Sequence, residues 1–133
     1  MFSILFQGED KIALNGGRAY PKGSKPGFIT YQYLNDDGTP IDTSNGTWTE
    51  EVRIEQLYVD TQPTPIATGI PTLAPGDGSD PAHSILTYGF SADDFSYVGQ
   101  FKMIFWIGNG TERHGSATFY YEVVDNPGAD PTV

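Results

Sequence analysis

The stretch FKMIFWI, residues Phe101–Ile107, is the strongest strand candidate, because it is nearly all apolar in a chain dominated by alternation with a period of two. Successive side chains of a strand point to opposite faces, so this pattern predicts one face against a core and one face toward solvent. No apolar stripe at helical spacing appears, which disfavours a helix. If Phe101, Met103, Phe105 and Ile107 face the core, then Lys102, Ile104 and Trp106 face outward.

The same alternation recurs on both sides of this stretch. Within Trp48–Val59 the apolar residues Trp48, Val52 and Ile54 share one parity, and Thr49, Glu51, Arg53 and Glu55 share the other. That pattern is typical of a half-buried strand with a wet outer face. The segments that we expect to form strands are Phe2–Phe6, Lys11–Leu14, Phe28–Leu34, Trp48–Val59, Ser84–Phe90, Phe101–Ile107 and Ala117–Val124.

Turn-forming residues separate these segments, since the chain of 133 residues holds 16 Gly and 10 Pro. Short strands with frequent turns predict a sandwich of antiparallel strands. We expect residues 1–125 to form a single β-sandwich domain and residues 126–133 to form a linker or flexible C-terminal tail. The Pro-rich segment Thr61–Pro81 is expected to be a long surface connection.

The charge balance excludes several classes of partner. The formal net charge is −10, and the seven basic residues do not cluster. Nucleic-acid binding relies on Lys and Arg that neutralise phosphates, so we predict no nucleic-acid partner and no anionic membrane partner. The chain has no Cys, which excludes disulfides, thiolate zinc sites and thiol nucleophiles.

The acidic segment Asn35–Gly38 looks like part of a calcium loop, and ligand spacing tests this idea. With Gly38 at the invariant glycine position, Tyr33 falls at the first ligand position and Ser44 at the last. Those positions need a carboxylate and a bidentate Glu, so the match fails. We predict instead a tight turn in which Asp37-Gly38 supplies the positive-φ residues, with an Asx turn at Asp42. The alternative that stays open is a weak cation site formed by Asp36, Asp37 and Asp42.

Catalytic patterns are not found in the sequence. The two histidines, His83 and His114, are expected on the surface, because no G-x-S-x-G or H-E-x-x-H motif accompanies them. Asp93 and Asp94 are the best candidates for a glycosidase carboxylate pair, but adjacent residues usually point apart. We therefore predict no enzymatic activity, no catalytic residues, no metal and no cofactor.

The order of motifs around the acidic turn resembles the N-terminal domain of phage baseplate upper proteins. The alternating segment Ile29-x-Tyr31-x-Tyr33 leads into the turn Asn35–Asp42, and Asn45-Gly46 then introduces Val52-x-Ile54. The later run Gly99-x-Phe101-x-Met103-x-Phe105 is similar to that family's G-x-Y-x-A-x-F strand. The resemblance covers roughly Ile29–Val124 and departs from the family at the Pro-rich segment.

This resemblance implies an all-β, immunoglobulin-like antiparallel β-sandwich of about 7–9 strands. It also implies a non-enzymatic structural module of a phage or prophage tail or baseplate, located in the virion and made in the bacterial host cytoplasm. Its partners would be other tail or baseplate proteins, or further copies of itself. Phe101 stands at the position of the immunoglobulin corner tyrosine, and Met103 stands at that of a disulfide cysteine.

The outward residues of two neighbouring strands suggest a partner-binding surface. If Ile104 and Trp106 face outward, Tyr120 of the following strand lies on the same face. We predict that Ile104, Trp106 and Tyr120 form an exposed apolar patch that binds a partner protein. The alternative is that another segment, such as Thr61–Pro81, covers these three side chains.

The pairing register tests which side chains meet across this pair of strands. A two-residue turn at Asn109-Gly110 would pair Met103 with Ser116, which sets an apolar face beside a polar one. A shift by one residue brings Phe101 and Met103 beside Phe119 or Tyr121 instead. We therefore expect a bulge or a longer loop between Gly108 and Gly115.

A second functional hypothesis is a carbohydrate-binding or adhesion module. Trp48, Trp106 and several tyrosines offer rings that stack on pyranoses, and Asn and Asp side chains offer hydrogen bonds. The partner would then be a host-surface saccharide. A hydrolase is the third and weakest hypothesis.

Overall fold

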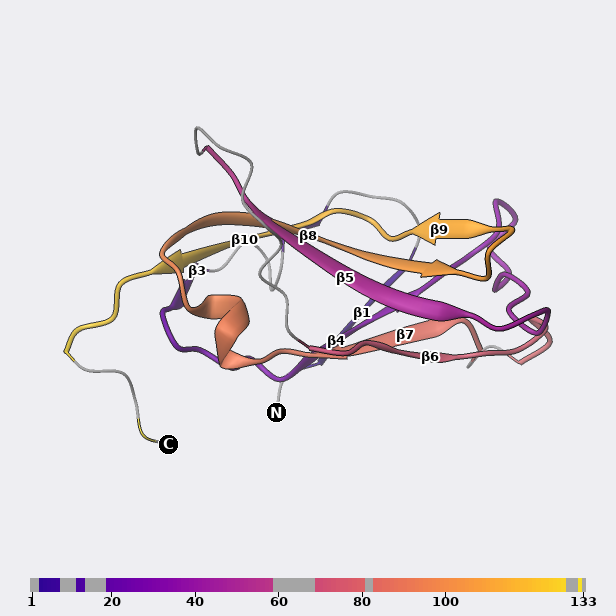
Figure 1. The fold of residues 1–133 in the computed structure, drawn as a ribbon, viewed down its shortest axis with the longest axis horizontal. Helices are drawn as coiled ribbons and strands as arrows, with labels where there is room; N and C mark the ends of the chain where they lie inside the picture. Colours follow the sequence, from indigo (N-terminus) through magenta and orange to yellow (C-terminus); the bar gives the residue numbers. More distant parts are fainter. Residues whose placement is uncertain are drawn as a thin grey trace.

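A computed structural model describes residues 3–7, 12–13, 19–58, 69–80, 83–128 and 132. Two β-sheets lie face to face, with the six-stranded sheet above the four-stranded sheet in Figure 1. Within these residues every regular element is a strand except η2 (Ala92–Phe95), a short 3-10 helix. The predicted all-β sandwich is therefore confirmed.

Each sheet has a simple order. The four-stranded sheet runs β1-β4-β7-β6, and the central path of the six-stranded sheet runs β2-β10-β8-β5, with β3 beside β10 and β9 beside β8. The orders β1-β4-β7-β6 and β5-β8-β10 correspond to the two sheets of an immunoglobulin sandwich. The strands are β1 (Ser3–Gln7), β2 (Ile12–Ala13), β3 (Ala19–Pro21), β4 (Phe28–Gln32), β5 (Thr49–Gln56), β6 (Thr72–Ala74), β7 (Ile85–Gly89), β8 (Gly99–Gly108), β9 (Arg113–Gly115) and β10 (Phe119–Val124).

The core lies between the sheets and is built from the inward parity of each strand. On β8 the inward side chains are at most 1% exposed, whereas the outward ones are half-buried, as the alternation predicted. Opposite sheets contribute aromatic rings in contact, such as Tyr88 and Phe105 with centroids 5.6 Å apart. Large buried side chains of both sheets form one cluster, which includes Tyr31, Tyr88, Phe95, Phe101, Phe105 and Phe119.

Two expectations about strands need correction. The N-terminal strands do not pair antiparallel, because β1 runs parallel to β4, and β2 and β3 run parallel to β10. The segment Thr61–Pro81 is not only a connection, because it contains β6, which pairs antiparallel with β7. Leu73 at the centre of β6 packs against the core. Residues 61–68 and 81 lie outside the described residues.

The predicted register is confirmed on the β8–β10 pair. Phe119 lies opposite Met103, and Tyr121 lies opposite Phe101. Trp106 pairs with Gly115, so residues 116–118 oppose only Ile104 and Phe105. The extra residue forms a β-bulge. Ser116 makes two hydrogen bonds to Phe105 at this bulge: its N–H donates to the Phe105 carbonyl at 2.8 Å, and its Oγ accepts from the Phe105 N–H at 2.9 Å.

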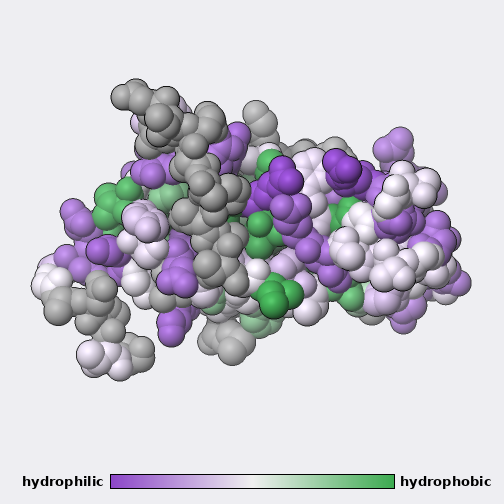
Figure 2. All heavy atoms as spheres, in the orientation of Figure 1, coloured by the Kyte–Doolittle hydropathy of each residue, from purple (hydrophilic) through white to green (hydrophobic). Residues whose placement is uncertain are grey.

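The loops that follow β4, β6 and β8 meet at one end of the sandwich, at the right in Figure 1. This loop end is mostly hydrophilic on the face drawn in Figure 2. Elsewhere on that face, hydrophobic residues form separate small areas between hydrophilic ones (Figure 2). The described residues contain no helix long and apolar enough to cross a membrane.

Candidate functional site

The three predicted partner-binding residues lie on the outer face of the six-stranded sheet. Ile104 and Trp106 share one parity of β8, and Tyr120 lies directly opposite Lys102, which has the same parity. Directly paired residues point to the same face of a sheet, so Ile104, Trp106 and Tyr120 share one surface. All three are half-buried. We call this surface the outer patch, and its role in binding a partner stays a prediction.

Charged residues border the outer patch on the side of β5. Arg53 lies opposite Ile104, and Glu51 lies opposite Trp106. The Arg53 Nε lies 3.0 Å from a Glu51 carboxylate oxygen, and the Lys102 Nζ lies 3.4 Å from Glu55. Such exposed ion pairs contribute little to stability. They do place charged groups next to an apolar surface, which is the arrangement found at the rim of a protein interface.

Trp106 is held by its own sheet. A Cβ placed on Gly115, its register partner, would lie 3.0 Å from the six-membered ring of Trp106. The indole therefore packs on the Gly115 backbone, an arrangement in which an aromatic ring covers a strand glycine. This contact fixes the orientation of the ring on the outer face and explains part of its burial.

The described part of the Pro-rich segment does not belong to this sheet. Residues 69–80 include β6 of the four-stranded sheet. The Leu73 N–H, at the free edge of β6, donates to the Glu50 carboxylate at 3.2 Å. Glu50 on β5 thus links the two sheets at this edge. It accepts a hydrogen bond from a backbone N–H that has no neighbouring strand to pair with.

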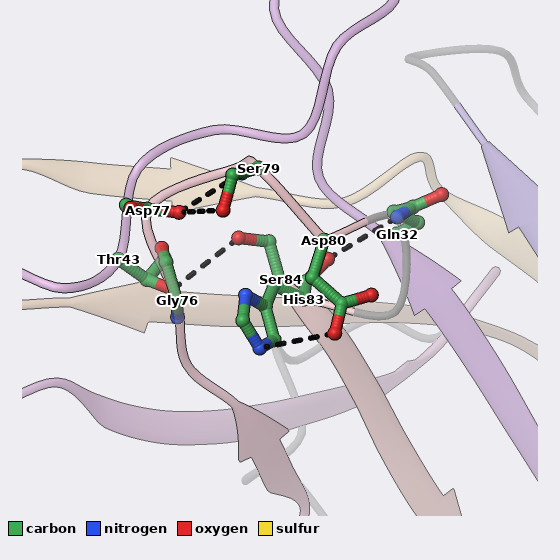
Figure 3. A network of polar contacts seen from close by, with 8 residues as sticks. All are labelled: Gln32, Thr43, Gly76, Asp77, Ser79, Asp80, His83 and Ser84. Carbon is green, nitrogen blue, oxygen red and sulfur yellow. Dashed lines mark hydrogen bonds and ion pairs between the residues drawn. The ribbon is translucent and has the colours of Figure 1, made fainter.

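Buried hydroxyl groups tie the loops together at the loop end (Figure 3). The Ser84 Oγ donates to the Ile41 carbonyl at 2.6 Å and lies 3.3 Å from the Thr43 Oγ1. Thr43 accepts from the Gly76 N–H at 2.9 Å. Ser84 is fully buried and has a φ of 62°, a strained backbone for a non-glycine residue that these bonds hold in place.

His83 lies beside this network but forms no catalytic triad with it. Its Nε2 lies 3.7 Å from the Asp80 carboxylate, and its ring covers Gly76, as Figure 3 shows. The Ser84 hydroxyl donates to a carbonyl rather than to the imidazole. Both histidines are half-buried, and His114 stacks on Trp48 with centroids 6.1 Å apart.

The segment Asn35–Gly38 is a turn, as predicted. The Gly38 N–H donates to the Asn35 carbonyl at 2.9 Å, and the Asn35 N–H donates to the Thr39 carbonyl at 2.7 Å. Only Gly38 of the Asp37-Gly38 pair has a positive φ, of 88°, so the expectation that Asp37 shares this conformation is wrong. Asp42 forms the expected Asx turn by accepting from the Ser44 N–H at 2.9 Å.

Three aspartates of the loop end accept hydrogen bonds from residues close to them in sequence. Asp37, Asp42 and Asp77 each accept from the hydroxyl and the N–H of the Ser or Thr two residues later. These hydrogen bonds lower the pKa of all three carboxyls. The part of the chain that the structure describes holds no group of three or more His, Cys, Asp or Glu side chains arranged to bind a metal.

The adjacent carboxylates Asp93 and Asp94 point to different environments. Asp93 is exposed, whereas Asp94 is fully buried. The Asp94 Oδ2 accepts from the Tyr88 hydroxyl at 2.8 Å and from the Ser91 N–H at 3.0 Å. The two groups therefore do not flank a common cleft as a glycosidase pair does.

Sequence reasoning missed exposed apolar residues near the end of β5 and the start of β8, at the end of the sandwich opposite the loop end. Tyr58, Tyr97 and Val98 are among the most exposed large apolar residues of the described chain, with Tyr58 at 89%. The Gln56 side chain donates to the Val98 carbonyl at 3.4 Å, which holds the end of β5 beside the start of β8. The signal available in the sequence was the pair Tyr97-Val98, which precedes the glycine that opens β8.

Comparisons with known proteins do not add an identity to this geometry. The chain matches no family model and no curated protein.

Proposed function

We propose that this chain is a non-enzymatic structural module of a phage or prophage tail or baseplate, which acts through protein–protein assembly. The motif order between Ile29 and Val124 supports this proposal, together with the sandwich architecture that the resemblance implies. The module would be located in the virion, and its partners would be copies of itself or other tail proteins.

The outer patch is the observation that carries the proposal. Ile104 and Trp106 lie on the outward face of a central strand. A polar side chain could occupy either position, so the fold alone does not require apolar residues there. Their ring and alkyl surfaces lie between the charged β5 and the aromatic Tyr120. An apolar centre with a charged border is the usual composition of an interface. Symmetric association through one such surface would give closed oligomers.

The molar mass in solution tests this assembly. We expect light scattering to show an oligomer that Ile104→Lys converts to a monomer with unchanged circular dichroism. Ile85→Lys is the matched control, because Ile85 is also half-buried and faces outward from a central strand of the opposite sheet. Loss of the oligomer in both variants, or a monomeric wild-type chain at high concentration, would refute self-assembly through the outer patch.

A carbohydrate-binding module is the second candidate, because Trp106 and Tyr120 lie on one face with rings of the kind that stack on sugars. A glycan array would show binding that Trp106→Ala abolishes if this candidate is correct. An array without signal for the wild-type chain would leave assembly as the better account.

A further inference from the structure

Two identical Asn-Gly-Thr triplets meet at the loop end. They are residues 45–47, which precede β5, and residues 109–111, which follow β8. The Asn109 Nδ2 donates to the Asn45 backbone carbonyl at 3.3 Å, so the two loops are in contact. Both following glycines have a positive φ, 78° at Gly46 and 91° at Gly110. The triplets thus share local sequence and similar glycine conformations.

An Asn-Gly pair is chemically reactive because glycine does not shield its own amide nitrogen. The glycine nitrogen attacks the Asn Cγ and loses its proton, and the side-chain nitrogen leaves as ammonia. Water then opens the resulting cyclic imide at either carbonyl and gives Asp or isoaspartate. Ring closure needs a free side chain that can rotate toward the glycine nitrogen.

The Asn109 side chain is restrained on both of its polar atoms. Its Oδ1 accepts from the Thr111 N–H at 2.9 Å and from the Glu112 N–H at 2.7 Å. Its Nδ2, the leaving group, donates to the Asn45 carbonyl. The side chain is also half-buried. Ring closure at Asn109 would therefore have to disturb these three hydrogen bonds.

The Asn45 side chain has none of these restraints. It is exposed, and within the described chain neither its Oδ1 nor its Nδ2 has a hydrogen-bond partner. Gly46 is exposed as well, which leaves its amide open to water and base. We infer that Asn45 is a site of spontaneous deamidation and that Asn109, in the same triplet, is protected by the fold.

The reaction would alter the contact between the two loops. Isoaspartate reroutes the main chain at residue 45 through Cβ and Cγ, and the carbonyl that accepts from Asn109 becomes part of a free carboxylate. Either product also adds a negative charge to a loop end that already carries Asp42 and Asp77. Deamidation would thus loosen the pairing of these loops as the protein ages.

Peptide mapping of the full chain measures both rates in one sample. After incubation at mildly alkaline pH in water labelled with oxygen-18, trypsin places the two sites in different peptides, because Arg53, Lys102 and Arg113 are cleavage sites between and after them. We expect Asn45 to react at least about tenfold faster than Asn109, a ratio that corresponds to a small difference in activation free energy. Asn45→Gln should remove the mass gain from its peptide.

The chain unfolded in urea is the internal control, since the identical triplets should then react at similar rates. A native ratio near one would overturn the inference, as would a faster reaction at Asn109. The inference also fails if native Asn45 stays intact over a period in which both sites react in urea.

Discussion

The Tyr121 hydroxyl donates a hydrogen bond of 3.0 Å to the backbone carbonyl of Asp94. Tyr121 also stacks on Phe101, with centroids 5.2 Å apart and planes inclined by 17°. By the sequence likeness to immunoglobulin domains, Phe101 stands where the corner tyrosine would be, and it has no hydroxyl. Tyr121 of the neighbouring strand β10 therefore supplies the hydrogen bond that Phe101 of β8 cannot make. This bond holds the η2 corner that precedes β8.

Tyr121→Phe should destabilise the fold without changing its shape. The substitution leaves a buried carbonyl without its donor, which costs about 1–3 kcal/mol. Urea unfolding followed by circular dichroism measures the loss. Tyr120→Phe is the control, because Tyr120 faces outward on the same strand and should change stability by less than about 0.5 kcal/mol. Equal effects of the two variants would show that the corner bond has no special role.

Tyr88→Phe should release the segment before β6. The Tyr88 hydroxyl donates to Asp94 and accepts from the Gly69 N–H at 3.3 Å, so one oxygen links the η2 corner to this segment. We expect faster hydrogen exchange at the Gly69 amide and a loss of about 1–3 kcal/mol. In the double variant with Tyr121→Phe the losses should not add, because both tyrosines act on Asp94. Unchanged exchange at Gly69 would rule out this link.

Gly115→Ala should disturb Trp106. The new methyl group would lie 3.0–3.3 Å from the indole ring, so the ring must shift or the bulge must move. We expect a loss of about 1 kcal/mol and a shift in Trp106 emission. Gly89→Ala is the matched control, since a methyl group on this strand glycine meets nothing within 4 Å. If Gly89→Ala proves as costly as Gly115→Ala, packing of the indole on Gly115 is not the cause.

Stability should fall at alkaline pH. Burial raises the pKa of Tyr33, Tyr88 and Tyr121 above the ordinary value of 10.0. Because the folded pKa values exceed the unfolded one, their contribution is complete below about pH 10 and is lost as the pH rises further. The urea midpoint between about pH 8 and pH 12 measures this decline. Tyr33→Phe should make it shallower, and an unchanged slope would contradict the assignment.

Alternation predicted β5, β8 and β10 because in each of these strands one parity is more buried than the other. It could not predict β3 and β6, which are three residues long and exist because longer strands pair with them. The parallel pairing of β1 depends on the path of the chain rather than on local pattern. Alternation also gives no sign that Thr43 and Ser84 are buried, because the hydrogen bond between them joins loops that are distant in sequence.

The outer patch was predictable in position but not in detail. Parity alone placed Ile104, Trp106 and Tyr120 on one face. The packing of Trp106 on Gly115 depends on the register of β9 against β8. This register is determined by the four-residue loop between the two strands and by the bulge at Ser116. The same bulge explains why Met103 meets Phe119 rather than Ser116.

Access of a quencher to Trp106 tests the assembly through the outer patch most directly. In a Trp48→Phe chain, Trp106 is the only tryptophan, so its emission and its quenching by acrylamide report on this surface alone. We predict that quenching weakens and the emission shifts to shorter wavelength as concentration rises and the oligomer forms. Quenching that stays constant while the molar mass increases would show that the chains associate through another surface.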